Sequence, residues 1–197
     1  MEKTFIFIGR SGCGKGTQIA ALKEHLTNSG DATQIFTVGT GDRFREFVAG
    51  TGYAHVLARE IYEHGSRQPD FLAVHMWATD LIAHVSDTAD EHLIFDGTPR
   101  SLSEAQMLDT ALRFFKRSAV AIVFLNVSRA WATEHLLGRG RGDDDAIGVQ
   151  KRLDWYDNDV APAVEYFRSH PVYRFVEVDG EQAPEEVTRK MIAGITA

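Results

Sequence analysis

The residues from Gly9 to Thr17, G-R-S-G-C-G-K-G-T, offer the clearest chemistry in this chain. They follow a short apolar stretch and precede a stretch with helical spacing, which predicts a tight turn between a strand and a helix. Glycines let several backbone N–H groups point at one anion, and the positive end of the following helix strengthens that field. The spacing G-x-x-x-x-G-K, with one extra glycine before the hydroxyl residue, is typical of a phosphate-binding loop. We therefore expect this segment to bind a nucleoside triphosphate.

The two functional side chains of this loop have distinct expected roles. Lys15 is placed to reach the β- and γ-phosphates, and the hydroxyl of Thr17 is placed to lie at Mg²⁺. The loop residues predicted to bind ATP are Gly12, Cys13, Gly14, Lys15, Gly16 and Thr17. Cys13 is the only cysteine, which excludes a disulfide framework and a four-cysteine zinc site. We interpret it as a small residue that fits the loop.

The elements that must position this loop alternate between strands and helices. Strands are expected at residues 4–9, 33–36, 92–95, 119–125 and 173–178. Helices are expected at residues 15–28, 43–49, 53–64, 70–82, 103–116, 128–137, 146–169 and 184–195. Such alternation predicts a parallel α/β sheet with helices on both faces, in which the unbroken apolar run 119–125 is a central strand. Ligands of these sheets bind beyond the carboxyl ends of the strands.

Helix ends carry their own signals. The side chain of Thr40 or Asp42 is expected to cap the helix that follows the second strand. The spacing Ser103-x-x-Gln106 predicts a capping box. Pro162 predicts a kink or an interruption within the long helix 146–169.

Four further groups follow the phosphate loop in order. They are Thr40-Gly41-Asp42-x-x-Arg45, Asp96-Gly97-x-Pro99-Arg100, Arg139 with Arg141-x-Asp143-Asp144, and Lys151-Arg152-Leu153. With the loop, they resemble the adenylate kinase family of nucleoside monophosphate kinases, in its short-lid form, over residues 5–187. The resemblance implies one domain, 1–197, built on a five-stranded parallel P-loop sheet flanked by helices on both faces. It also implies a helical monophosphate-binding arm at 39–77 and a short lid at 138–146.

The residue types support the same chemistry independently of the resemblance. Moving a phosphoryl group from ATP to a nucleoside monophosphate brings two polyanions together, and the acceptor phosphate is itself the nucleophile. Catalysis is then mostly positioning and charge neutralisation. Guanidinium groups grip phosphate oxygens in a fork, so the reaction needs several of them. The candidates from separate segments are Arg45, Arg100, Arg139, Arg141 and Arg152.

The resemblance implies a role for each matching residue. Arg45 and Arg100 hold the acceptor phosphate, and the lid-side arginines close over the transferring group. Asp96 orients water on Mg²⁺ together with Thr17. The implied catalytic set is Lys15, Arg100, Arg139, Arg141 and Arg152. Further implied ATP contacts are His135, Arg139 and Gly180. The implied monophosphate contacts are Thr40, Gly41, Arg45, Gln68, Gly97, Arg100, Glu104, Arg141 and Arg152. Asp143 and Asp144 order the lid arginines.

One position departs from the commonest pattern on the acceptor side. Glu104 stands where the family usually has a glutamine that hydrogen-bonds adenine. A carboxylate accepts from the amino group of adenine but does not donate to its ring nitrogen, and it suits the adjacent N–H groups of guanine better. Two interpretations stay open: Glu104 reads the base, or it merely opens a helix while Gln106 compensates. Thr40 matches the threonine on the AMP side of the family, which favours AMP.

A second departure lies on the donor side. His135 stands where an arginine usually packs against the ATP base. An imidazole can stack on adenine, so we expect weakened donor binding, and the alternative is a surface histidine on a helix.

Composition bounds the remaining possibilities. The chain has 197 residues, of which 44% are hydrophobic, and a formal charge of −7, which argues against a general nucleic-acid surface. No apolar run approaches the roughly 20 residues needed to cross a membrane, and a strand begins too early for a signal peptide. We expect a cytoplasmic monomer whose partners are ATP and a nucleoside monophosphate, with Mg²⁺ as cofactor.

The leading hypothesis is the reversible reaction of ATP and AMP to two ADP. One alternative is a kinase for GMP, CMP, UMP or a deoxynucleotide. Another is a nucleotide-sensing module, although a sensor has no need of the complete arginine set. A switch-type P-loop ATPase would need a water-activating residue, and nothing in the sequence suggests one.

Overall fold

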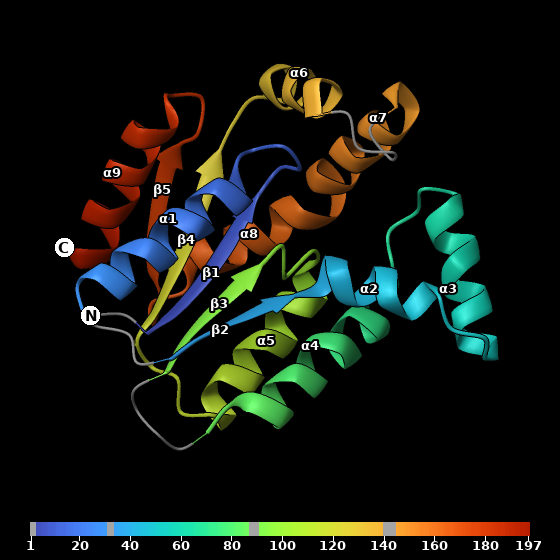
Figure 1. The fold of residues 1–197 in the computed structure, drawn as a ribbon, viewed down its shortest axis with the longest axis horizontal. Helices are drawn as coiled ribbons and strands as arrows, with labels where there is room; N and C mark the ends of the chain where they lie inside the picture. Colours follow the sequence, from blue (N-terminus) through green and yellow to red (C-terminus); the bar gives the residue numbers. More distant parts are fainter. Residues whose placement is uncertain (1–2, 31–33, 87–90, 140–144) are drawn as a thin grey trace.

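The computed structural model describes residues 3–30, 34–86, 91–139 and 145–197. Its strands form one five-stranded sheet in the order β2-β3-β1-β4-β5, and every neighbouring pair is parallel (Figure 1). The strands are β1 (Thr4–Gly9), β2 (Gln34–Gly39), β3 (Glu91–Asp96), β4 (Val120–Asn126) and β5 (Arg174–Asp179). The predicted parallel α/β sheet is therefore confirmed. The apolar strand β4 lies inside the sheet, as predicted, although the central position belongs to β1.

The register brings the carboxyl ends of the strands to one edge. Gly39 pairs with Asp96, and Asn126 pairs with Asp179. Between them, Gly9 at the end of β1 pairs with Leu125. The polar and glycine-rich segments that follow these strands consequently begin side by side.

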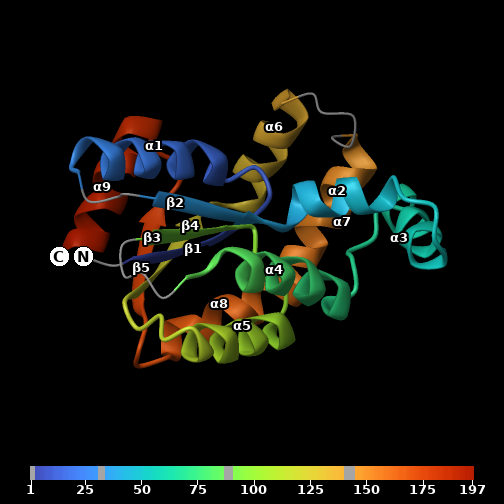
Figure 2. The ribbon, with the colours of Figure 1, turned by 60° about the horizontal axis from the view of Figure 1, so that its bottom comes forward.

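Helices cover both faces of the sheet (Figure 2). On one face lie α1 (Lys15–Asn28) and α9 (Pro184–Thr196), which pack on alternate strand residues such as Phe5 and Phe7. On the other lie α4 (Asp70–His84), α5 (Leu102–Phe114) and α8 (Ala161–Ser169), which pack on Ile6 and Ile8. The period of two along β1 thus builds two hydrophobic layers, one on each side of the sheet.

Two groups of helices lie beyond the carboxyl edge. The helical arm contains α2 (Thr40–Val48) and α3 (Tyr53–Glu63), which share a small apolar cluster with α4: Phe44, Ala58, Leu72 and Met76. Across the edge lie α6 (Arg129–Arg139) and α7 (Ala146–Trp155) (Figure 1). Because the arm has its own apolar cluster, its helices do not depend on the sheet for all of their burial.

The start of the arm differs from the sequence-based expectation. Strand β2 runs on to Gly39, so the loop expected there is absent, and α2 begins at Thr40 with Gly39 as its N-cap residue. The predicted cap by Thr40 or Asp42 is wrong, because no side chain caps this helix. The side chain of Thr40 is instead buried, and its hydroxyl accepts a hydrogen bond from Thr98 Oγ1 at 3.1 Å.

The long helix expected at 146–169 is interrupted, as Pro162 predicts. A π-helical turn, Tyr156–Val160, separates α7 from α8. Pro162 lies in the first turn of α8, where a missing backbone N–H costs little. Upstream, α6 runs to Arg139, so Gly138 and Arg139 belong to a helix and not to a loop.

No described helix is both long enough and apolar enough to span a lipid bilayer.

Candidate active site at the carboxyl edge of the sheet

The loop between β1 and α1 has the backbone that the glycine pattern requires. Gly14 caps α1 with φ of 87°, a left-handed conformation that other residues adopt only with strain. Lys15 folds back over the loop, where its Nζ donates to Gly9 O at 2.8 Å and to Arg10 O at 2.9 Å. The Cys13 thiol is buried, and Lys15 Nζ lies 3.5 Å from its sulfur. An ammonium group held on two carbonyls at a helix N-terminus can exchange them for phosphate oxygens.

Neighbouring strands hold this loop in place. Gly180, just after β5, donates its N–H to Asn126 O at 2.9 Å. A β-carbon built on Gly180 would lie 2.8 Å from Val127 Cγ1 and 3.6 Å from Cys13 O. A side chain here would press on Val127, whereas its contact with the loop would be ordinary, so the packing of β5 against the segment after β4 favours a glycine independently of any ligand.

Arg10 ties the start of the loop to the π-helical turn. Its guanidinium lies 4.1 Å from the ring centroid of Tyr156 and donates to Asp157 Oδ1 at 2.6 Å. It also donates to Val127 O at 3.3 Å. Arg129 of α6 donates to the other carboxylate oxygen of Asp157 at 2.8 Å. The loop and the helices on both sides of the predicted lid thus share one ionic network.

Across the edge, three guanidinium groups gather at the base of the arm; we call Arg45, Arg67 and Arg100 the arginine cluster. A β-carbon built on Gly41 would lie 3.6 Å from Arg45 Nη1 and 3.7 Å from Arg100 Nη2. Burial lowers the pKa of Arg100, and the like charges of Arg67 and Arg45 lower it further, while Glu104 and Asp96 oppose the shift. Arg100 also donates from Nε to Gly97 O at 2.7 Å. Arg45 is exposed, but like charges gathered beside a glycine still form a site that an anion would stabilise.

Glu104 is fully buried in the first turn of α5. Its backbone N–H donates to the N-cap hydroxyl of Ser101 at 3.1 Å, and its Oε2 accepts from the N–H of Arg100 at 2.6 Å. The capping box predicted at Ser103 and Gln106 is therefore wrong; the arrangement belongs to Ser101 and Glu104, which have the same spacing. If Glu104 served only to open the helix, the hydrogen bond of Oε2 would be explained, but the burial of Oε1 would not. Oε1 is buried and makes no hydrogen bond with any described residue.

Glu104 should leave a measurable mark on the pH dependence of stability. Burial raises its pKa above the ordinary 4.5, although the Arg100 N–H and charge oppose the shift. The folded state therefore binds this proton more tightly than the unfolded state does. The stabilisation is complete below the unfolded-state pKa and is lost as pH rises through the folded-state pKa. Urea unfolding of the wild type and of Glu104→Gln gives the two unfolding free energies. We expect their difference, wild type minus variant, to fall as pH rises from about 4.5. A flat or rising difference would contradict this.

Other predicted acceptor residues occupy the same region. Thr40 and Gln68 are buried, and the side-chain amide of Gln68 makes no hydrogen bond with any described residue. Gly97 follows β3 in a left-handed conformation, φ 67°, next to Arg100. Gln106, in contrast, lies on the exposed side of α5 and does not share the buried environment of Glu104.

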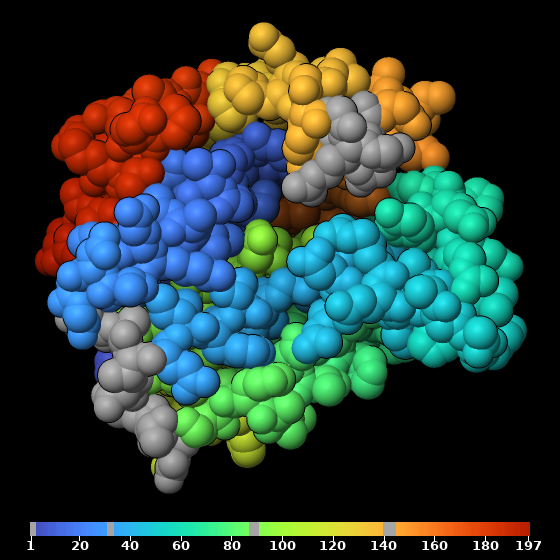
Figure 3. Space-filling view, viewed as in Figure 1, coloured from blue at the N-terminus to red at the C-terminus, as the bar shows by residue number. Residues whose placement is uncertain are grey.

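The lid side is described only in part. Arg139 ends α6 and is exposed, and Arg152 is half-buried on α7. The predicted lid residues Gly140, Arg141, Gly142, Asp143 and Asp144 lie outside the described residues. Lys151 of α7 donates to His64 O at 2.8 Å, which joins α7 to the turn before α4. A hollow opens between α1, α2 and α7 on the face shown in Figure 3.

The candidate magnesium residues come from the end of one strand and the start of the helix that follows its neighbour. Asp96 ends β3 and pairs in register with Phe7 of β1, while Thr17 is exposed in the first turn of α1. The described residues contain no group of three His, Cys, Asp or Glu side chains placed to hold a metal. Mg²⁺ at nucleotides is commonly held by one or two protein oxygens together with phosphates and water. A hydroxyl and a carboxylate therefore fit this ion.

His135 is exposed on α6 and stacks on Trp131, with ring centroids 3.4 Å apart and planes 16° apart. Its Nδ1 lies 2.9 Å from Trp131 O, and because a carbonyl only accepts, Nδ1 carries the proton. The stacked Trp131 ring covers one face of the imidazole, a contact that the sequence pattern did not predict.

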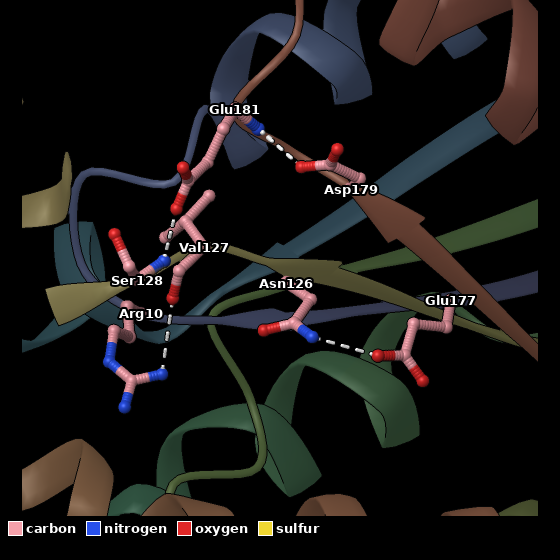
Figure 4. Close-up of a pocket in the computed structure, with 7 residues that line it drawn as sticks. All are labelled: Arg10, Asn126, Val127, Ser128, Glu177, Asp179 and Glu181. Atoms are coloured by element: carbon pink, nitrogen blue, oxygen red, sulfur yellow. Dashed lines mark hydrogen bonds between the residues drawn. The ribbon is translucent and has the colours of Figure 1, made fainter.

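An open pocket of about 560 Å³ lies where β4 and β5 end (Figure 4). Asn126 donates to Glu177 at 2.8 Å, Glu181 accepts from the N–H of Ser128 at 2.5 Å, and Asp179 accepts from the N–H of Glu181 at 3.0 Å. Three carboxylates and one guanidinium, that of Arg10, line this pocket, so its lining is acidic on balance and suits a polyphosphate poorly. The loop between β1 and α1, with its glycines and Lys15, therefore remains the predicted phosphate site.

Sequence reasoning missed three residues that the fold brings to the site. Arg67 joins the arginine cluster and also pairs with Asp70 at 2.5 Å, and Arg10 anchors the phosphate loop through Asp157. Ser101 was overlooked, although its spacing from Glu104 is a visible signal. No comparable signal marks Arg10, whose partner Asp157 is distant in sequence, or the position of Arg67 beside Arg45 and Arg100, which only the fold brings about.

Comparison with known proteins agrees with this geometry. The family model described as adenylate kinase matches residues 7–172. An adenylate kinase 1 of Nostoc sp. is 30% identical over 190 residues, 95% of this chain and 96% of the relative. Adenylate kinases of Xylella fastidiosa and Thermus thermophilus are 32% and 31% identical, each over 96% of this chain and at least 95% of the relative. The chain therefore belongs to the adenylate kinase family and is a nucleoside monophosphate kinase of that family.

Proposed function

We propose that this enzyme catalyses the reversible transfer of the γ-phosphoryl group of ATP to AMP, yielding two ADP. The observation that carries the proposal is the arginine cluster, which lies at Gly41 beside the carboxyl edge that also holds the phosphate loop. An anion-binding loop and a second cation cluster on one edge suit two phosphorylated substrates better than one. Similarity to relatives named adenylate kinase supports AMP as the acceptor.

Each side chain has a role in this scheme. Lys15 and the loop N–H groups bind the donor phosphates, and Arg45 and Arg100 hold the acceptor phosphate in line with them. The acceptor oxygen is already anionic, so the reaction needs no general base. Arg139, Arg141 and Arg152 neutralise the transferring group from the lid side.

Magnesium would be held by Thr17 and, through water, by Asp96. When bound, it neutralises charge on the donor phosphates. We further propose one catalytic domain, 1–197, with residues 39–77 as the acceptor arm and 138–146 as the lid. Closure of both excludes water and limits hydrolysis of ATP. We propose that the enzyme acts as a cytoplasmic monomer.

A transfer assay with Mg·ATP against AMP, GMP, CMP and UMP tests the proposal. We expect AMP to give the highest kcat/KM. A higher value for another monophosphate would overturn the choice of AMP. No turnover with any of the four would favour a nucleotide-sensing protein.

The free oxygen of Glu104 favours one second candidate, a kinase for GMP. Glu104→Gln is expected to reduce GMP turnover more than AMP turnover, because an outward amide N–H opposes the N1–H of guanine, whereas it can donate to N1 of adenine. Its oxygen can still accept from Arg100 N–H and keep the helix start. We expect the AMP-to-GMP ratio of kcat/KM to rise about tenfold. An unchanged ratio would leave Glu104 with the helix-opening role only.

A further inference from the structure

Two buried polar side chains lie where α4 and α5 begin, and neither has all of its hydrogen bonds. Gln68 is 3% exposed, and both polar atoms of its side-chain amide lack partners among the described residues. Glu104 is 0% exposed, and its Oε1 lacks a partner as well. Unpaired polar groups in a protein interior are costly, and native structures contain few of them. Finding two beside the arginine cluster points to a ligand that completes them.

Contacts place these two side chains in one region. Ser103 Oγ, next to Glu104, donates to Asp70 Oδ2 at 2.9 Å, which ties the start of α5 to the start of α4. Gln68 lies two residues before the start of α4, and its backbone carbonyl oxygen accepts from Arg67 Nη1 at 3.5 Å. The charge of Arg67 acts on both Glu104 and Arg100. Gln68 and Glu104 therefore both lie beside the arginine cluster.

The two side chains offer complementary hydrogen-bonding groups. When ionised, the free oxygen of Glu104 only accepts, whereas the amide of Gln68 has two N–H donors and one acceptor oxygen. The Watson–Crick edge of adenine presents an amino donor at position 6 and a ring acceptor at N1. A carboxylate alone can satisfy the amino group and leaves N1 without a donor.

We propose that Gln68 and Glu104 divide the reading of the acceptor base between them: Glu104 Oε1 accepts from the 6-amino group of adenine, and Gln68 Nε2 donates to N1. Gln68 is then a specificity-determining residue that supplies the donor Glu104 lacks. This inference rests on the proposed function, because it assumes adenine in the acceptor site. Gln106, on the exposed side of α5, plays no part in it.

The test pairs a variant of the protein with a variant of the base. The KM and kcat for AMP and for 1-deaza-AMP, in which a C–H replaces N1, are measured with the wild type, Gln68→Leu and Gln106→Leu. In the wild type, 1-deaza-AMP should show a KM about ten- to a hundredfold above that of AMP, the usual loss when a buried donor is left unpaired. In Gln68→Leu, the KM for AMP should rise by the same factor, with no further loss for 1-deaza-AMP. The KM for ATP should stay within about twofold, since only the acceptor base is affected.

Gln106→Leu makes the same chemical change on an exposed position and should behave as wild type with both acceptors. The melting temperature of ligand-free Gln68→Leu should equal or exceed that of the wild type, because leucine removes an unpaired buried amide. This second readout separates loss of base recognition from loss of the fold.

The outcomes distinguish the inference from the proposed function. Equal KM values for AMP and 1-deaza-AMP in the wild type would overturn the inference, even if AMP is the preferred acceptor. A further loss with 1-deaza-AMP in Gln68→Leu would also overturn it, because another group would then contact N1. A preference of the wild type for GMP over AMP would overturn the proposed function itself, together with the assignment of adenine.

Discussion

Replacement of Lys15 by methionine is expected to lower kcat by about 1,000-fold or more, since an oriented cation at the transferring phosphate contributes that much in phosphoryl transfer. In the free enzyme, the Lys15 ammonium group donates to Gly9 O and Arg10 O. These are main-chain acceptors of the loop itself, so the lysine needs only a small movement to reach a bound phosphate. Methionine keeps a stem of similar length and removes the charge and all three donors.

The measurement is steady-state transfer to AMP with saturating ATP, compared with Lys23→Met on the same helix α1. The control removes the same charge from a position away from the loop and should retain activity within about twofold, as is usual for surface substitutions. The far-ultraviolet circular dichroism of Lys15→Met should match that of the wild type. Near-normal turnover in Lys15→Met would show that the phosphate-loop assignment is wrong.

Replacement of Arg100 by alanine is expected to weaken binding of the monophosphate about a hundredfold or more, because a desolvated guanidinium paired with a phosphate is worth several kcal/mol. The affinity for ATP should change by less than about threefold, as expected for a contact made by only one substrate. The structural reason is position: Arg100 meets Arg45 over Gly41, at the end of β3 and not in the loop before α1. Burial and neighbouring positive charges already lower the pKa of Arg100, so an arriving phosphate relieves an existing repulsion.

Calorimetric titration of the variant with AMP and with ATP measures the two effects separately. Arg189→Ala is the matched control, since Arg189 is an exposed arginine of α9 paired with Glu186 at 2.6 Å. It should alter neither affinity. Equal losses for AMP and ATP in Arg100→Ala would mean that the acceptor site has been placed incorrectly.

The sequence by itself determined the order and type of the elements. The helix Lys15–Asn28 was predicted to the residue, and the start of α4 at Asp70 likewise. Both rest on local signals, above all apolar residues at helical spacing. The first helix is also followed by a glycine, Gly30, with a left-handed φ of 71°. The phosphate loop was equally visible, because its glycines and Lys15 are contiguous and their geometry is set by the chain itself.

Errors arose where a neighbour in space overruled a local preference. Thr40 has the residue type of a helix cap, but its hydroxyl is hydrogen-bonded to Thr98. Strand β2 extends to Gly39 because Gly39 pairs with Asp96 of β3. The capping box was placed at Ser103, because two overlapping S-x-x-E/Q patterns begin there and at Ser101. Only the buried position of Glu104 decides between them.

The division between sequence and tertiary structure is clearest at the acceptor side. Arg45, Arg100 and Glu104 were visible as isolated residues, each compatible with a surface role. Three features depend on contacts between segments far apart in the chain: the approach of Arg45 and Arg100 at Gly41, the position of Arg67 in the arginine cluster, and the unpaired amide of Gln68. A sequence determines which groups can hydrogen-bond or carry charge, because these are properties of single side chains. Which of them are desolvated, and which remain without a partner, depends on packing, and the tertiary structure alone decided it.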